Sequence, residues 1–211
     1  MPRLNVSQVI EREAKAQTRK DQWRNIYQEC YEFALPQRNL YGGQYEGSVP
    51  GQNKMERVFD STAIHATQRF ANRIQAGLFP PQKEWCRLET GSAIPEEQKR
   101  EAQEALDQYT NRMFEVLRQT NFDLAMGEFL LDLCVGTAVM MITPGDETTP
   151  IRFTPIPQYL VAIEEGTYGN VDNVYRKLKM KAETIKQEFP DAEMSVELDQ
   201  IIKDNPSQEI D

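Results

Sequence analysis

The sequence predicts an α+β fold in which several amphipathic helices pack with a small antiparallel β-sheet. Apolar residues recur at three- and four-residue spacing over several long stretches, which is typical of helices with one buried face. Two later runs rich in Val, Ile, Tyr and Leu flank a glycine-containing turn, as in a β-hairpin. With 211 residues, of which 39% are hydrophobic, the chain can form one domain or two small ones.

The first element is a long helix over residues 4–34. Its later half spaces apolar side chains by three and four residues, at Trp23, Ile26, Tyr27, Cys30, Tyr31 and Ala34. Leu35-Pro36 ends it, because proline cannot continue a helix. Residues 36–55 then form a loop with four glycines. A loop of this length is usually functional or ordered by a partner.

A second helix is predicted over about 61–78, with capping oxygens from Asp60 and Ser61. We expect its buried stripe to be Ala63, Ala66, Phe70, Ile74 and Leu78. Pro80-Pro81 closes the helix, and residues 84–89 alternate polar and apolar side chains as a short strand does.

Two more helices follow, over about 95–120 and 121–136. Pro95 is expected at the first helical position. The first of these two helices has an apolar seam made of Ala102, Leu106, Tyr109, Met113 and Val116. The second is capped by Asn121, ends at Gly136 and is apolar almost all round, as expected of a helix at the centre of a domain.

The last part of the chain contains the strands. Residues 138–142 and 151–154 read as strands joined by a turn, and 159–178 as a β-hairpin. A short helix follows over 182–189. From Asp191 there are seven acidic residues and one lysine, which predicts a solvated, flexible end over 191–211.

Composition excludes several functions. The net charge of −9 argues against a protein that clamps duplex phosphate over a basic face. Three widely spaced cysteines, Cys30, Cys86 and Cys134, predict neither a disulfide framework nor a zinc site. The start is polar throughout, so no signal peptide is expected. Leu124–Ile142 carries Glu128 and Asp132, which favours a buried helix and strand over a membrane span.

Few residues suggest chemistry. The single histidine, His65, lies off the expected stripe and is interpreted as a surface residue. Glu128 and Asp132 share a helix face and could hold a metal or one shared proton. The favoured interpretation is that they form the one polar stripe of this helix or accept an arginine from a neighbouring element. The loop residues Arg38, Tyr41, Tyr45 and Lys54 either stack on nucleic acid or belong to an assembly loop. We expect no catalytic, cofactor-binding or metal-binding residues and no cofactor.

Three passages together resemble one family. Tyr27–Pro36 is followed by the Gly-rich loop, and Phe153–Pro157 precedes the hairpin. Between them lies the most specific signature, from Val58 to Trp85, which contains Asp60, Ser61, Ala63, Pro80, Pro81 and Trp85. In this order the passages resemble the head-to-tail connecting, or portal, proteins of podovirus-type phages, over about residues 20–190.

The resemblance implies that residues 1–190 have a portal wing-like fold and that the stem and clip of that family are absent from this chain. It implies a non-enzymatic subunit of a homo-oligomeric ring, commonly a dodecamer, at the portal vertex of the virion, assembled in the host cytoplasm. The expected partners are the terminase motor, the major capsid protein, and tail or adaptor proteins. Double-stranded DNA would pass through the channel without sequence specificity, and no membrane is involved.

For this function, Arg38, Tyr41, Gly42, Gly43 and Tyr45 are candidate subunit contacts in an assembly loop. The main alternative is a non-viral α+β adaptor or scaffold that binds a partner through its long first helix. A metal-dependent hydrolase that uses Glu128 and Asp132 is a third possibility.

Overall fold

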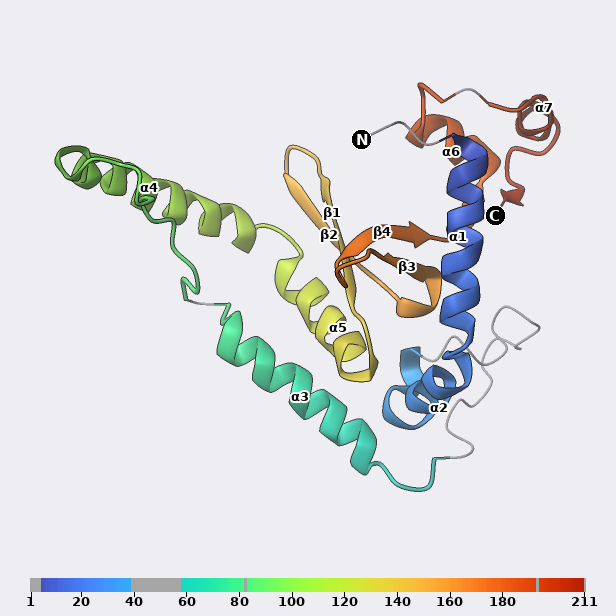
Figure 1. Ribbon diagram of the computed structural model, residues 1–211, viewed down its shortest axis with the longest axis horizontal. Coiled ribbons are helices and arrows are strands. Elements are labelled where there is room, and N and C mark those ends of the chain that lie inside the picture. The colour runs from blue at the N-terminus through green and yellow to red at the C-terminus, as the bar shows by residue number, and fades with distance from the viewer. Residues whose placement is uncertain (1–4, 39–57, 82, 193, 211) are drawn as a thin grey trace. The chain divides into compact units, whose positions relative to one another are not determined.

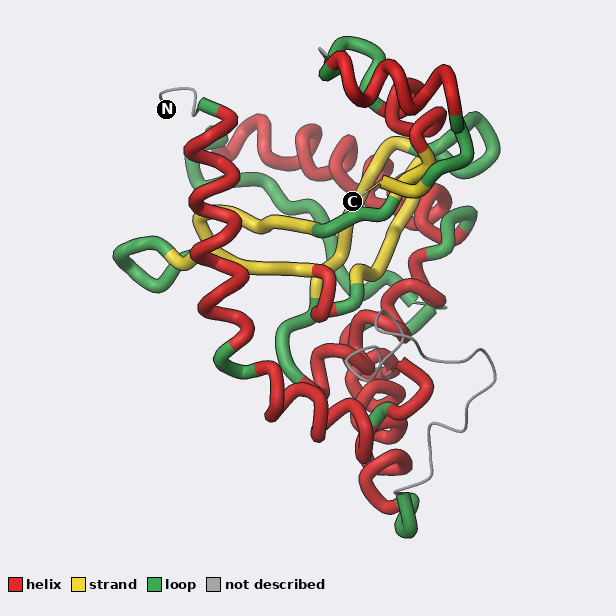
Figure 2. The backbone as a smooth tube through the Cα atoms, turned by 90° about the vertical axis from the view of Figure 1, so that its right-hand side faces the viewer, coloured by secondary structure: helices red, strands yellow, loops and turns green. Residues whose placement is uncertain are grey.

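A computed structural model describes residues 5–38, 58–81, 83–192 and 194–210. The chain forms two compact units, which we call the helical unit (Gln17–Tyr159) and the hairpin unit (Met1–Ala16 with Leu160–Asp211). Their boundary falls inside the first helix, α1 (Val6–Asp21). The described residues contain seven α-helices and three two-stranded antiparallel sheets, which confirms the α+β class (Figure 2). The one small sheet that was expected is divided into three pairs.

Helix α5 is the centre of the helical unit. It contacts α2, α3 and strand β2, and Figure 1 shows it between α3 and the β1–β2 hairpin. Its residues Ala125 and Leu130 are each 2% exposed, so the predicted central helix is confirmed, although Leu124 on its outer side is exposed. The elements of this unit are α2 (Arg24–Ala34), α3 (Thr62–Leu78), α4 (Glu96–Arg118), α5 (Phe122–Val135), β1 (Val139–Pro144) and β2 (Ile151–Ile156).

The predicted continuous helix over 4–34 is wrong at one point. Helix α1 ends at Asp21 and α2 begins at Arg24, with a turn between them in which the Trp23 amide donates to the Lys20 carbonyl at 2.9 Å. No proline or glycine marks this turn, and the apolar spacing continues across it. In α2 the buried side chain is Tyr31, whereas Trp23 and Ile26 are both 54% exposed.

The buried face of α3 also differs from the predicted stripe. Its buried residues are Ile64, Thr67 and Ala71, while Leu78 from the predicted stripe is 59% exposed. The Thr67 hydroxyl donates to the Ala63 carbonyl at 3.0 Å, which satisfies it inside an apolar contact. Thr67 was not in the predicted stripe, and four alanines on the helix made its faces hard to tell apart. The remaining predicted stripe residues are Ala63 and Ala66, which are exposed, Phe70, which is at the exposed limit, and Ile74, which is half-buried.

Residues 84–89 are extended but form no strand, because their partner is a helix. The Leu88 amide donates to the Thr110 hydroxyl of α4 at 3.1 Å, and Gln103 donates to the Leu88 carbonyl at 3.0 Å. The α4 face they meet contains buried Thr110 and Phe114, whereas Tyr109, from the predicted seam, is 66% exposed. Pro95 precedes α4 as its cap, with an extended ψ of 143°, and is not its first helical residue.

Asn121 joins α5 to the β1–β2 hairpin instead of capping its own helix. Its side-chain amide donates to the Phe153 carbonyl at 2.7 Å, and its oxygen accepts from the Phe153 amide at 3.0 Å. The side chain makes no capping bond at the start of α5. Gly136 ends α5 as predicted, and a Cβ there would lie 2.7 Å from the Gln158 Oε1 atom and 2.9 Å from the Tyr27 ring.

The hairpin unit is built around β3 and β4, which confirms the predicted hairpin. The turn between them contains Gly169, whose φ of 76° is in the left-handed region that favours glycine. Arg12 of α1 forms an ion pair with Glu164 of β3 at 3.8 Å. In addition to the first part of α1, the hairpin unit contains β3 (Val161–Glu165), β4 (Val171–Arg176), β5 (Met180–Lys181), α6 (Ala182–Glu188), α7 (Val196–Asp204) and β6 (Glu209–Ile210).

The acidic end contains regular structure that its composition did not indicate. Ser195 caps α7 by accepting from the Leu198 amide at 3.2 Å. Strand β6 pairs with β5 in the register Met180 with Ile210. Ala182, at the start of α6, is completely buried. The chain from Ala182 to Ile210 is therefore a folded part of the hairpin unit, and we call it the acidic segment.

Candidate functional site

The structure places one of the five predicted loop residues. Arg38 ends a short 3-10 helix (Pro36–Arg38) that follows α2. The other four, Tyr41, Gly42, Gly43 and Tyr45, lie outside the described residues.

Arg38 binds two carboxylates of α5. Its Nη1 donates to Glu128 Oε2 at 2.9 Å and its Nη2 to Asp132 Oδ2 at 2.8 Å. The Tyr31 hydroxyl of α2 donates to the second Asp132 oxygen at 3.1 Å. We call these four residues the Arg38 clamp. The prediction that Glu128 and Asp132 share a face and accept an arginine is confirmed. Ninety residues separate Arg38 from Glu128 in sequence, so spacing alone did not identify the donor.

The clamp is mostly buried. The side chain of Asp132 is 2% exposed and that of Arg38 18%, while Glu128 is 45% exposed at the edge. Burial raises the pKa of Asp132, against the opposing effect of the Arg38 charge and the two hydrogen bonds. Burial disfavours the Arg38 cation as well, but the Asp132 and Glu128 charges outweigh it and raise the Arg38 pKa. The buried Arg38 Nε has no hydrogen-bond partner in the described part of the chain.

The Arg38 clamp links two helices and leaves no site for a metal at Glu128 and Asp132. The guanidinium occupies the oxygens that a cation would need, and the described residues hold no group of three or more His, Cys, Asp or Glu arranged for a metal. The clamp joins the end of α2 to the middle of α5.

The first half of the signature shapes the start of α3. Asp60 Oδ1 accepts from the Thr62 amide at 2.9 Å and from the Thr62 hydroxyl at 2.7 Å, and these bonds lower the Asp60 pKa. Ser61 occupies the cap position but makes no side-chain capping bond, and Ala63 is exposed. His65 is exposed, as predicted.

The second half of the signature builds an aromatic cluster. Helix α3 ends at Leu78 just before Pro80 and Pro81, and the chain then brings Trp85 back over the helical unit. The Trp85 ring stacks on Phe122 with centroids 5.8 Å apart and meets Phe79 edge-on at 5.0 Å. It also contacts Phe114 of α4 at 5.5 Å, and Phe122 contacts Phe153 of β2 at 5.2 Å. One tryptophan thus joins α3, α4 and α5, and Phe122 extends the cluster to β2.

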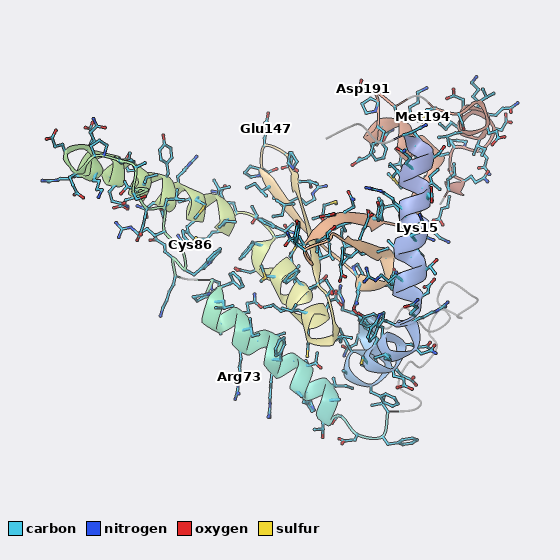
Figure 3. The ribbon with its side chains drawn as sticks, viewed as in Figure 1. Lys15, Arg73, Cys86, Glu147, Asp191 and Met194 are labelled. Atoms are coloured by element: carbon cyan, nitrogen blue, oxygen red, sulfur yellow. The ribbon has the colours of Figure 1, made fainter. Side chains whose placement is uncertain are left out.

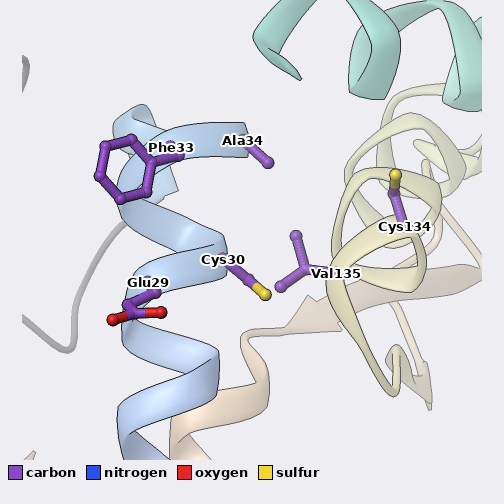
Figure 4. A pocket seen from close by; sticks show the side chains of 6 residues that line it. All are labelled: Glu29, Cys30, Phe33, Ala34, Cys134 and Val135. Carbon is purple, nitrogen blue, oxygen red and sulfur yellow. The ribbon is translucent and has the colours of Figure 1, made fainter.

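A groove that the sequence pattern did not predict lies between α2 and the end of α5. It has a volume of about 330 Å³ and is lined by Glu29, Cys30, Phe33, Ala34, Cys134 and Val135 (Figure 4). The Cys134 thiol is turned toward α3, where it lies 3.8 Å from the Thr67 hydroxyl. All three cysteines of the chain are free thiols. The lining is mainly apolar, which suits contact with an apolar side chain better than acid-base chemistry.

No helix among the described residues combines the length and the apolar character needed to cross a membrane. Residues 124–142, which were weighed as a span, contain most of α5 and the first four residues of β1.

Comparison with known proteins gives one informative result. No curated protein matches the sequence. A family model described as "Bacteriophage head to tail connecting protein" matches residues 6–211. That range covers nearly the whole chain, including the signature from Val58 to Trp85. It decides against the non-viral adaptor, because the family is a structural component of the phage virion. The chain belongs to the bacteriophage head-to-tail connecting protein family, whose role is to join the head to the tail.

Proposed function

We propose that the protein is a subunit of a homo-oligomeric portal ring whose central channel passes double-stranded DNA during packaging and ejection. The observation that carries this proposal is the family match over residues 6–211, since a connector between head and tail lies on the path of the genome. The residues from Asp60 to Trp85 that resemble podovirus-type portals support the same assignment. A dodecamer is the ring size that the resemblance suggests.

The surface of the helical unit suits a subunit that is covered on several sides. Large apolar side chains are exposed on α2, before α3 and on α5, and among them Phe59 is 95% and Leu124 is 72% exposed. Exposed apolar residues in such number are typical of surfaces that other proteins cover. Trp23 and Ile26 add an apolar stripe to the outer side of α2.

The charge of the chain is compatible with a channel. A net charge of −9 repels phosphate, so DNA would slide past such a subunit without being held. We therefore propose passage of DNA without sequence specificity. The proposed location is the portal vertex of the virion, after assembly in the host cytoplasm.

The proposed partners follow from this location. The capsid side would meet the major capsid protein and the terminase motor, and the opposite side would meet tail or adaptor proteins. Arg38 is engaged inside its own chain through the Arg38 clamp, so a subunit contact by the residues after it would start from a fixed point. Contacts by Tyr41, Gly42, Gly43 and Tyr45 stay predictions.

The test is direct observation of the oligomer. Mass photometry of the purified protein should show a discrete high-mass species, and negative-stain microscopy should show rings with a central channel. A protein that stays a monodisperse monomer over the full accessible concentration range would rule out the ring.

A further inference from the structure

The outer face of α3 is basic and has no acidic residue. Between Ser61 and Lys83 the chain contains no Asp or Glu, although the whole protein has 33. His65, Arg69 and Arg73 follow at four-residue spacing, so they share one face, and all three are exposed. Figure 3 shows Arg73 on the side of α3 that faces away from α5. We call this surface the α3 basic face.

The two arginines of this face are not neutralised. Within the residues that the structure describes, neither Arg69 nor Arg73 forms an ion pair or a hydrogen bond. An apolar side chain accompanies them, because Phe70, which follows Arg69, is 36% exposed. A surface with unpaired cations beside exposed apolar groups is suited to an acidic protein partner.

The acidic segment has the complementary chemistry. Residues 182–210 contain eight acidic and two basic residues, so their net charge of −6 is most of the chain's −9. None of the described carboxylates between residues 182 and 210 forms an ion pair. Exposed apolar side chains occur here too, with Phe189 at 50% and Val196 at 80%.

Helix α4 shows that unpaired charges are not the rule in this protein. Along α4, Lys99 pairs with Glu96, Arg100 with Glu104 at 3.3 Å, and Arg112 with Glu115 at 3.0 Å. Its charges are balanced locally. The α3 basic face has an excess of positive charge and the acidic segment an excess of negative charge, so the two surfaces are complementary.

We propose that the α3 basic face of one copy of this chain binds the acidic segment of a second copy. This inference rests on the proposed ring and specifies one of its contacts. Each chain carries one basic face and one acidic segment, so the contact is head-to-tail and repeats around a ring until it closes. Arg69 and Arg73 provide the charge, and Phe70 provides apolar area.

Charge reversal with a matched control tests the contact. We expect Arg69→Glu combined with Arg73→Glu to raise the concentration for half-assembly by at least about tenfold, because like charges then face each other. Arg100→Glu with Arg112→Glu changes the net charge equally on α4 and should leave assembly unchanged. Wild-type assembly should weaken between about 0.05 M and about 1 M salt.

A reciprocal exchange provides the rescue. Glu188 and Asp204 are exposed at the C-terminal ends of α6 and α7, where lysine suits the helix dipole. Adding Glu188→Lys and Asp204→Lys to the Arg69→Glu, Arg73→Glu variant should restore assembly to within about threefold of wild type. Failure of this rescue, with all variants folded by circular dichroism, would overturn the assignment of the acidic segment.

Crosslinking identifies which copy is involved. A photoreactive phenylalanine at position 72 is mixed with isotopically heavy chains, and mixed light and heavy crosslinks to residues 182–210 are expected. Crosslinks confined to one chain would overturn the proposal. Normal assembly of the Arg69→Glu, Arg73→Glu variant would also overturn the proposal, and the ring would then form without this contact. The same conclusion would hold if that variant assembled normally and lost only its retention on duplex DNA. A wild-type protein that never self-associates would instead contradict the proposed function itself.

Discussion

Two arginine and aspartate pairs in the helical unit have nearly the same shortest N–O distance and very different surroundings. Arg38 binds Asp132 at 2.8 Å and Arg87 binds Asp107 at 2.7 Å. The Asp132 side chain is 2% exposed, whereas Arg87 is 57% and Asp107 is 39% exposed. The first pair joins α2 to α5, and the second fastens the extended segment before α4 to that helix.

The difference shows that the N–O distance is a poor guide to how much an ion pair contributes to stability. Water competes for the Arg87 pair and screens it, so such a pair contributes little. At the Arg38–Asp132 contact most water is excluded, and these two partners depend on each other to remain buried with their charges. The intact Arg38–Asp132 pair therefore adds little net stability. Loss of either partner, however, would leave the other charge buried and would disrupt the packing of α2 against α5.

Removing the clamp's cation should have the largest effect. Arg38→Met leaves Asp132 buried without its counter-charge, and we expect a loss of about 3–5 kcal/mol in the free energy of unfolding. Urea denaturation followed by circular dichroism measures it. The double variant Arg38→Met, Asp132→Leu removes both charges and should recover most of the loss. A double variant as unstable as the single one would show that the arginine's packing matters more than its charge.

The same variant should respond to pH in a defined direction. The Asp132 pKa is already raised by burial, and loss of Arg38 raises it further. A group whose folded-state pKa is raised stabilises the fold at low pH, and this contribution is lost as the pH rises through that pKa. The Arg38→Met variant should thus lose more stability than wild type between about pH 5 and about pH 8. In an Arg38→Met background, Asp132→Asn should abolish this extra slope.

A steric change beside the clamp should have the next largest effect. In Gly136→Ala the new methyl group meets the Tyr27 ring at 2.9 Å and the confined Gln158 side chain at 2.7 Å. We expect a loss of about 1–3 kcal/mol, as for other overpacked sites. Gly77→Ala is the control, since nothing lies within 4 Å of a Cβ there, and it should be neutral or stabilising. Equal effects of the two changes would contradict the close packing at the end of α5.

Near the exposed Arg87–Asp107 pair, the buried Thr110 hydroxyl should contribute more to stability than the ion pair itself. Thr110 is 2% exposed, and its hydroxyl accepts from the Leu88 amide. Thr110→Val keeps the shape and leaves that amide unpaired, which should cost about 1 kcal/mol because Leu88 is near enough to solvent for water to compensate in part. Thr110→Ser, which keeps the hydroxyl, should cost less in thermal denaturation.

The smallest effect is expected for the exposed pair itself. Arg87→Met should shift the unfolding midpoint by no more than the error of the measurement. The hydrogen bond from Arg87 lowers the Asp107 pKa, so whatever the pair contributes is present above the usual aspartate range and lost as the pH falls. This trend is opposite to that of Arg38→Met. A large effect at neutral pH would refute the ranking by burial.

Sequence reasoning succeeded where a signal was local. The β3–β4 hairpin followed from its glycine-containing turn, and the end of α5 followed from Gly136. The shared face of Glu128 and Asp132 followed from four-residue spacing. Each of these depends on residues within one turn or one helix, where the backbone determines which side chains are neighbours.

It failed where the partner is distant or the pattern is degenerate. The segment 84–89 alternates like a strand, but its partner is α4, and alternation does not reveal what an extended chain pairs with. In α3, alanines on several faces hid that Thr67 is buried. Asn121 was expected to cap a helix, and its amide instead binds the backbone of Phe153, 32 residues away. An arginine partner for Glu128 and Asp132 was expected, but the sequence did not indicate which arginine it would be.

The aromatic cluster and the exposed α2 face also give the molecule two built-in spectroscopic reporters. The chain has only two tryptophans. Trp85 stacks on Phe122 inside the helical unit, so its emission will follow denaturation of that unit. Trp23 is 54% exposed in the turn before α2, so its emission will shift to the blue only when another surface covers it. With Trp85→Phe and Trp23→Phe variants, folding and assembly become two separately readable fluorescence signals in a protein that needs no added dye.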